Sequence, residues 1–388
     1  MPFLKVDINP EVLKWARESI GETTVSVADR LKIEVEIIKT WESNGKEIPI
    51  GKLEQLAKIY KRSLAVFFLS EKPKEILSPK DFRTLPENQK MPLSRETRLA
   101  IRKAQRLQLL ALDLAIEIEE KIPKIIPDVG SREPGILARE IRNRLGIKVE
   151  QQLEWKDDYQ ALTEWIKVLE ENGVLIFQIS MPVEEIRGFS LQPNGYPVIV
   201  LNLKDSVRAR IFSLFHEYCH ILLKMVGICD LGDEEHVSDE VKSIEKYCNY
   251  FAGAFLVPSK YLLEHLLVKG ISEQQEDFNK IIRQISNSFR VSREVILRRL
   301  LILEKISKNF YEDKIKEFRE EFKQVKAQSK GGWLVPYRKC LQERGSSFIS
   351  MVFEAKRLGK ITTRDITDYL GIRRKHLFKL EKVVIKKS

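Results

Sequence analysis

The segment Arg208–Lys224, RARIFSLFHEYCHILLK, carries two histidines four residues apart in an otherwise apolar stretch. Its apolar residues recur at the spacing of one helical face, so we expect a packed helix here. That face is formed by Phe212, Phe215, Cys219 and Leu222. Residues four apart also share a face of a helix, one turn from each other. His216 and His220 therefore point the same way and can share one cation.

Glu217 directly follows the first histidine and is offset from it by about 100° around the helix. This offset keeps its carboxylate from joining the histidines as a ligand, but it allows a hydrogen bond to a water on the metal. The pattern H-E-x-x-H on a helix is typical of zinc hydrolases for this reason. The competing interpretation is a core helix with two polar side chains. Partly buried imidazoles need partners, however, and a metal provides them.

A catalytic zinc usually takes three protein ligands and leaves one position for water, so a third ligand is expected downstream. The stretch DEVKSIEKYCNYFAGAFLVP, residues 239–258, predicts a second amphipathic helix with Glu245 in its middle. A carboxylate at such a position needs a partner, and a cation is one. His236 is the alternative, but the acidic stretch around it is typical of a solvated loop. Cys219 is a further candidate, although free cysteine is mostly a small buried hydrophobe.

The composition indicates a globular chain with a basic surface. Its 388 residues are enough for two or three domains of roughly 150 residues. The formal net charge of +11 and the pI of about 9.2 favour an anionic partner such as nucleic acid without requiring one. Four cysteines without a C-x-x-C pair do not indicate a disulfide framework. No secretory leader and no apolar run of roughly 18 residues are evident, so we expect a cytoplasmic protein without a membrane segment.

Residues 10–70 predict five short helices. The second and third, TTVSVADRLKI and EVEIIKTWESNG, are joined almost directly, which is typical of a helix-turn-helix. Their shared apolar face would consist of Ala28, Leu31, Ile33, Ile38 and Trp41. The second helix of such a pair reads DNA, and Lys39 and Thr40 are its candidate contacts. Its three carboxylates would repel phosphate, so recognition of a protein, or a packing role, stays open. These carboxylates are Glu34, Glu36 and Glu42.

The period of the apolar pattern changes just before the histidine helix. Residues 173–180, GVLIFQIS, and 186–203, IRGFSLQPNGYPVIVLNL, predict three short strands with a hairpin turn at Pro193-Asn194-Gly195. The remaining chain has helical spacing. The predicted fold class is therefore mainly α with a small antiparallel sheet (α+β).

The C-terminal stretch 361–382, ITTRDITDYLGIRRKHLFKLEK, repeats the apolar spacing of the N-terminal helix pair. Any two helices that meet at a sharp turn need such positions, so we interpret this repeat as structural. We interpret its basic residues as a solvated face rather than a DNA contact. They are Arg373, Arg374, Lys375, His376 and Lys379.

The two predicted helices RARIFSLFHEYCHILL and IEKYCNYFAGAFLVP resemble those of the ImmA/IrrE metallo-endopeptidases. The preceding hairpin, an N-terminal helix pair of the XRE type, the DFRTLP motif and the stretch 331–381 are also similar to fused members of this family. The resemblance implies zinc bound by His216, His220 and Glu245, with Glu217 as the catalytic base. In the family motif E-x-x-A-N-x-F-A, Cys248 stands here at the alanine. Asn249 stands at the asparagine and is expected to orient a ligand histidine.

On this basis the chain divides into four regions. They are an XRE-type helix-turn-helix domain at 1–70, a proline-rich linker at 71–93, a zincin-like metallopeptidase domain at 94–305 and a helical C-terminal domain at 306–388.

The sequence thus predicts a zinc-dependent endopeptidase in which Glu217 activates a zinc-bound water and delivers its proton to the leaving amine. The resemblance implies that its substrate is a transcriptional repressor or similar regulator. The candidate donors to the oxyanion are Tyr218, Tyr247, Tyr250 and His265. The alternative is a DNA-binding transcriptional regulator with a structural or idle metal site. Structural zinc sites are normally closed by four protein ligands, whereas only three are evident here.

Overall fold

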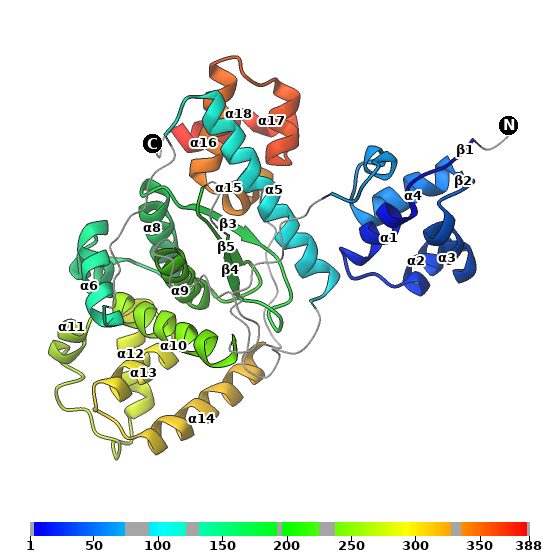
Figure 1. The fold of residues 1–388 in the computed structure, drawn as a ribbon. Helices are drawn as coiled ribbons and strands as arrows, with labels where there is room; N and C mark the ends of the chain where they lie inside the picture. The colour runs from blue at the N-terminus through cyan, green and yellow to red at the C-terminus, as the bar shows by residue number, and fades with distance from the viewer. Residues whose placement is uncertain are drawn as a thin grey trace. The chain divides into compact units, whose positions relative to one another are not determined.

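The computed structural model describes residues 4–73, 93–121, 132–191, 196–224, 237–326 and 335–385 (Figure 1). Tertiary contacts divide them into two compact units, one made of residues 4–73 and 93–103 and the other of the rest. Most of the predicted linker at 71–93, with its DFRTLP motif, lies outside the described residues, as does the predicted hairpin turn at 193–195. The division into four regions therefore stays a prediction.

The first unit consists of short helices around one apolar core. Its elements are β1 (Lys5–Val6), α1 (Pro10–Glu18), α2 (Thr24–Leu31), α3 (Val35–Asn44), β2 (Ile48–Pro49), α4 (Ile50–Tyr60), the 3-10 helix η1 (Leu64–Phe68) and the first turns of α5 (Arg95–Glu117). Strands β1 and β2 form a short antiparallel pair. The four α-helices and η1 occupy the stretch for which five short helices are predicted.

Helices α2 and α3 form a tight pair separated by three residues. The side chain of Thr23 caps α2, and Lys32 ends this helix in the left-handed conformation with a φ of 52°. The expected apolar face is buried except for Ile33, which is partly buried against the same core. Glu42 does not face solvent as expected, because it accepts hydrogen bonds from Arg17 of α1 at 2.7 and 2.9 Å. This carboxylate therefore joins α3 to α1 and is not part of an exposed DNA-reading surface.

The second unit confirms the predicted fold class, mainly α with small sheets. Its elements after α5 are α6 (Pro134–Leu145), α7 (Val149–Glu154), α8 (Asp158–Glu171), β3 (Leu175–Ile179), β4 (Gly188–Leu191), β5 (Val198–Asn202), α9 (Val207–Lys224), α10 (Val237–Leu256), α11 (Ser259–Glu264), α12 (Phe278–Phe289), α13 (Arg293–Ile302), α14 (Lys308–Lys326), α15 (Pro336–Arg344), α16 (Ser346–Arg357), α17 (Thr363–Leu370), the 3-10 helix η2 (Arg374–His376) and α18 (Leu377–Ile385). Within the described ranges, every helix is too short or too polar to cross a lipid bilayer.

The expectation of an antiparallel sheet needs one correction. The three strands have the order β3-β5-β4. Strands β4 and β5 form the predicted antiparallel hairpin, but β3 runs parallel to β5. Strand β5 takes the centre, where both of its edges are hydrogen-bonded. Because β4 reverses the chain between them, β3 and β5 then run in the same direction.

Helices cover both faces of this sheet (Figure 1). On one face, Ile176, Ile199 and Leu201 belong to the same apolar core as α8 and α9. On the other face, Phe177 of β3 meets Phe348 of α16 edge-on, with 5.8 Å between ring centroids. Every residue of β3 and β5 is accordingly buried. Strands buried on both faces are typically near-continuous apolar runs, and four of the five residues of each strand are apolar here.

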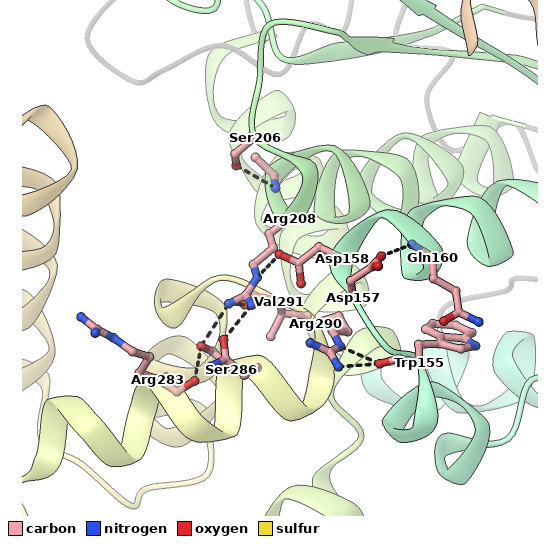
Figure 2. Close-up of polar contacts among 12 residues, drawn as sticks. Trp155, Asp157, Asp158, Gln160, Ser206, Arg208, Arg283, Ser286, Arg290 and Val291 are labelled. Carbon is pink, nitrogen blue, oxygen red and sulfur yellow. Dashed lines mark hydrogen bonds and ion pairs between the residues drawn. The ribbon is translucent and has the colours of Figure 1, made fainter. Parts of the chain in front are cut away.

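The N-terminal end of α9 is anchored by Arg208 (Figure 2). Its Nε donates to the carboxylate of Asp158 at the start of α8, at 2.8 Å. Its terminal nitrogens donate to the Ser286 hydroxyl and the Asn287 side chain of α12, and to the carbonyl of Val291. One charged side chain thus links the histidine helix to both α8 and α12.

The C-terminal end of α10 is held by three buried polar side chains. Arg142 donates to the carbonyl of Phe255 at 2.7 Å, and Gln152 donates to that of Leu256 at 3.0 Å. Arg299 donates to the carbonyl of Val257 at 3.1 Å. These carbonyls have no partner within the helix, and cations are favourable at this end of the helix dipole. The two helices that carry the predicted metal ligands are therefore each fixed at one end.

Candidate metal centre

Helices α9 and α10 pack through aromatic side chains that determine how the helices face each other. Phe215 of α9 stacks on Phe255 of α10, with 4.1 Å between ring centroids. Trp165 of α8 packs edge-on against both rings, at 4.9 and 5.5 Å. This packing turns the histidine face of α9 toward the Glu245 face of α10.

His216, His220 and Glu245 converge on one point. The Nε2 atoms of the two histidines lie 3.1 Å apart. The Glu245 oxygens lie 3.2 Å from Nε2 of His216 and 3.1 Å from Nε2 of His220. In the described part of the chain, these three residues form the group of ligand-type side chains close enough to hold a metal ion.

The geometry of this group fits a zinc ion. Zinc binds imidazole nitrogen and carboxylate oxygen at about 2.0–2.1 Å, so two ligand atoms of a tetrahedral site lie roughly 3.3–3.4 Å apart. The observed separations are within a few tenths of an ångström of this value. Two imidazole nitrogens that face each other also need a proton or a cation between them. Two imidazoles and one carboxylate form a donor set that suits zinc and leaves one position for water.

The electrostatics of the group favour a cation as well. Burial raises the pKa of the Glu245 carboxyl, but hydrogen bonds with His216 and His220 outweigh it and hold this pKa well below its ordinary value. Glu245 is therefore ionised, as a ligand must be. Its side chain is 26% exposed, whereas both histidines are buried. The group is thus open to solvent beside Glu245.

Asn249 lies one turn after Glu245 on the same face of α10. Its Oδ1 is 3.1 Å from Nδ1 of His216. When Nδ1–H donates to this oxygen, the proton stays on Nδ1 and the lone pair of Nε2 faces the metal position. Asn249 thus lies where the sequence predicts a residue that orients a ligand histidine.

Glu217 is fully buried beside the histidines and lies close to strand β4. A Cβ atom on Gly188 would be 3.6 Å from Cγ of Glu217 and 3.0 Å from the carbonyl oxygen of Val200. Glycine at this position therefore allows the close approach of the Val200 carbonyl, and Glu217 lies within van der Waals distance of the same site. Sequence reasoning did not select Gly188, although a glycine within a strand often marks such a close approach.

Of the other two candidate ligands, the structure describes only Cys219, which does not join this group. Cys219 is buried in the apolar core, and His236 lies outside the described residues.

The four candidate oxyanion donors differ in their contacts. The Tyr247 hydroxyl donates to the carbonyl of Arg132 at 2.8 Å. The ring of Tyr250 lies against the Arg299 guanidinium, and that of His265 packs against Phe289. Tyr218 is buried, which raises its pKa to about 12.

The candidate DNA contacts Lys39 and Thr40 lie exposed on α3, in the first unit. Lys39 forms an ion pair with Glu36 at 2.7 Å. The Thr40 hydroxyl donates to the carbonyl of Glu36 at 2.8 Å. Both side chains are therefore engaged within their own helix.

Comparison with known proteins agrees with the chemistry of the metal centre. Residues 169–301, which include all three converging residues, match the family model of the IrrE N-terminal-like domain, peptidase M78. No curated protein matches the chain. A transcriptional regulator of Mycobacterium tuberculosis with a solved structure is similar at 16% identity and a TM-score of 0.30. The match covers 51% of this chain and 51% of that regulator, so the chain spans about half of its length. The family match supports a metallopeptidase-type or regulator-related role for this segment.

Proposed function

We propose that the protein is a zinc-dependent endopeptidase, with zinc held by His216, His220 and Glu245 and with Glu217 as the general base. The observation that carries this proposal is the convergence of two imidazole nitrogens and one carboxylate within 3.2 Å of each other. The match of residues 169–301 to a peptidase family model supports it.

The chemistry divides between the metal and the protein. When bound, zinc would lower the pKa of a water toward 7 and polarise the scissile carbonyl. Glu217 takes the proton of the water that attacks the carbonyl carbon, and it delivers this proton to the amine as the C–N bond breaks. Asn249 keeps the His216 ring in the orientation that presents Nε2 to the metal.

The replacement Glu217→Gln tests the base. We expect the variant to keep one zinc per chain and to lose at least about 100-fold in the cleavage rate of a proteome-derived peptide library. Glu264→Gln, an exposed change on α11, is the matched control and should leave both unchanged. Full activity of Glu217→Gln would remove Glu217 as the base.

We infer from the family resemblance that the substrate is a repressor or a similar regulator, and that the N-terminal helix pair selects this substrate or its site on DNA. The Glu217→Gln variant provides the experiment, because an inactive enzyme can retain its substrate. A protein captured by this variant should be cut by the wild type and left intact by the variant. Captured proteins that resist the wild-type enzyme would contradict the inference.

The second candidate is a DNA-binding regulator with a structural or idle metal site. It is favoured by the three-residue turn between α2 and α3 and by the net charge of +11. If α3 reads DNA, Lys39→Gln should weaken DNA binding and reduce its dependence on salt. Cleavage that depends on Glu217 distinguishes the two candidate functions, because a protein with an idle metal site should cleave no substrate.

A further inference from the structure

A large cavity in the second unit lies apart from the metal centre. Its volume is about 2680 Å³, and it is lined by α8, β3, α15 and the turn before α18. None of the residues of the metal centre lines it. Ligand sites for small molecules typically have 300–1,000 Å³, so this cavity can hold such a ligand together with water.

Arg210 of α9 lines this cavity and is only 4% exposed. One terminal nitrogen donates to the side-chain oxygen of Gln178 at 2.6 Å. Its Nε has no hydrogen-bond partner among the described residues. Asp205, whose charge acts on Arg210, is paired instead with Arg187 at 3.3 Å. A neutral amide therefore holds this guanidinium in place, and Arg210 forms no ion pair among the residues that the structure describes.

Arg344, the last residue of α15, lines the same cavity. Its Nε and Nη1 are buried and have no hydrogen-bond partner in the part of the chain that the structure describes. Burial lowers the pKa of this guanidinium, although the charge of Glu343 opposes the effect. The turn that follows is tightly packed, because a Cβ on Gly345 would lie 2.6 Å from the carbonyl oxygen of Ile176. Arg344 thus lies at the cavity next to a tightly packed turn.

Six carboxylates line the cavity, and four of them contact residues other than these arginines. Glu170 accepts a hydrogen bond from the Ser346 hydroxyl, Glu171 pairs with Lys167, Glu343 with Lys339 and Glu354 with Arg357. Burying guanidinium N–H groups that have no hydrogen-bond partner is unfavourable. Arg210 and Arg344 both place such groups on the wall of one cavity, so a bound anion would stabilise them.

We propose that this cavity binds an organic anion whose carboxylate or phosphate oxygens are held by the guanidinium groups of Arg210 and Arg344. A guanidinium is a planar fork of donors that matches both of these groups. Lys375 of η2 also lines the cavity and adds positive charge.

Titration of the full-length chain with inorganic phosphate and with citrate tests the proposal. Binding is followed by calorimetry and by thermal unfolding, with sodium chloride holding the ionic strength constant. We expect saturable binding of at least one anion, and Arg344→Met and Arg210→Met should each raise its Kd at least tenfold. Binding of phosphate alone would identify a phosphate ester as the ligand class, and binding of citrate alone would identify a carboxylate. Binding of both would show that the site recognises the oxyanion oxygens that the two groups share.

Thermal unfolding without ligand gives a second readout. Arg344→Met removes a partly buried guanidinium whose Nε and Nη1 have no hydrogen-bond partner among the described residues, so its Tm should match or exceed that of the wild type. Arg364→Met removes an exposed charge on α17 outside the cavity and should change neither Tm nor Kd. The proposal is overturned if neither anion binds saturably to the wild type. It is also overturned if both arginine variants bind the anions as tightly as the wild type does.

Discussion

Replacing Asn249 with alanine should weaken zinc binding by about 10- to 100-fold. The change removes the oxygen that lies 3.1 Å from Nδ1 of His216. The ring can then carry its proton on Nε2, which must be free to bind the metal. Partners that orient ligand histidines typically contribute 10- to 100-fold in metal affinity, which corresponds to about 1.4–2.8 kcal/mol.

The metal-free protein should lose less from the same change. A hydrogen bond between neutral groups contributes only about 1 kcal/mol to the free energy of unfolding. The effect of Asn249→Ala on zinc binding should therefore exceed its effect on the stability of the apoprotein. A larger loss in zinc affinity than in apoprotein stability would show that Asn249 orients His216 and does not only contribute to packing.

Competition with a chelator of known affinity, at fixed pH, measures zinc binding, and thermal unfolding of the apoprotein measures the packing contribution. Asn143→Ala, an exposed change on α6, is the matched control. If Asn249→Ala binds zinc within threefold of the wild type, the orienting role is refuted. If the wild type itself binds no zinc, the metal centre is refuted instead.

Three further changes test the scaffold. Gly188→Ala places a Cβ 3.0 Å from the Val200 carbonyl, so we expect slower cleavage at nearly unchanged zinc affinity, as measured by kinetics and chelator competition. Arg208→Met removes the link from α9 to α8 and α12 and should lower the free energy of unfolding by about 1–2 kcal/mol, because the pair with Asp158 is partly exposed; an unchanged denaturation midpoint would contradict this role. Gly345 has a φ of +73°, and an alanine Cβ there would clash with the Ile176 carbonyl, so Gly345→Ala should lower the free energy of unfolding by more than about 2 kcal/mol in the same assay.

The candidate metal centre can be predicted from the sequence because it depends on helical periodicity. His216 and His220 share a face in any regular helix, and the position of Glu245 within a second apolar helix indicates it as the third ligand. The structure brings these three residues together. The tight helix pair α2–α3 can be predicted for the same reason, because the spacing of its apolar residues is a local property of the sequence.

Features that depend on contacts between distant parts of the chain could not be predicted from the sequence. Nothing in the local pattern of β3 indicates that it pairs with β5 rather than β4. The sequence around Glu42 is typical of an exposed helix position. Its ion pair with Arg17 forms only because α1 packs against α3. Likewise, the sequence does not reveal that Arg210 Nε is buried without a hydrogen-bond partner among the described residues, because this depends on the surrounding elements.

The outer position of β3 in the sheet has a consequence for truncated forms of the protein. The Leu175 amide donates to Pro197, and Leu203 donates to the Ile179 carbonyl, so odd-numbered residues of β3 direct their backbone groups toward β5. Ile176 then directs its carbonyl outward, where the chain at Gly345 shields it. Unshielded strand edges recruit other chains into intermolecular sheets. A protein shortened to end before α15 should therefore aggregate even if its metal ligands are intact.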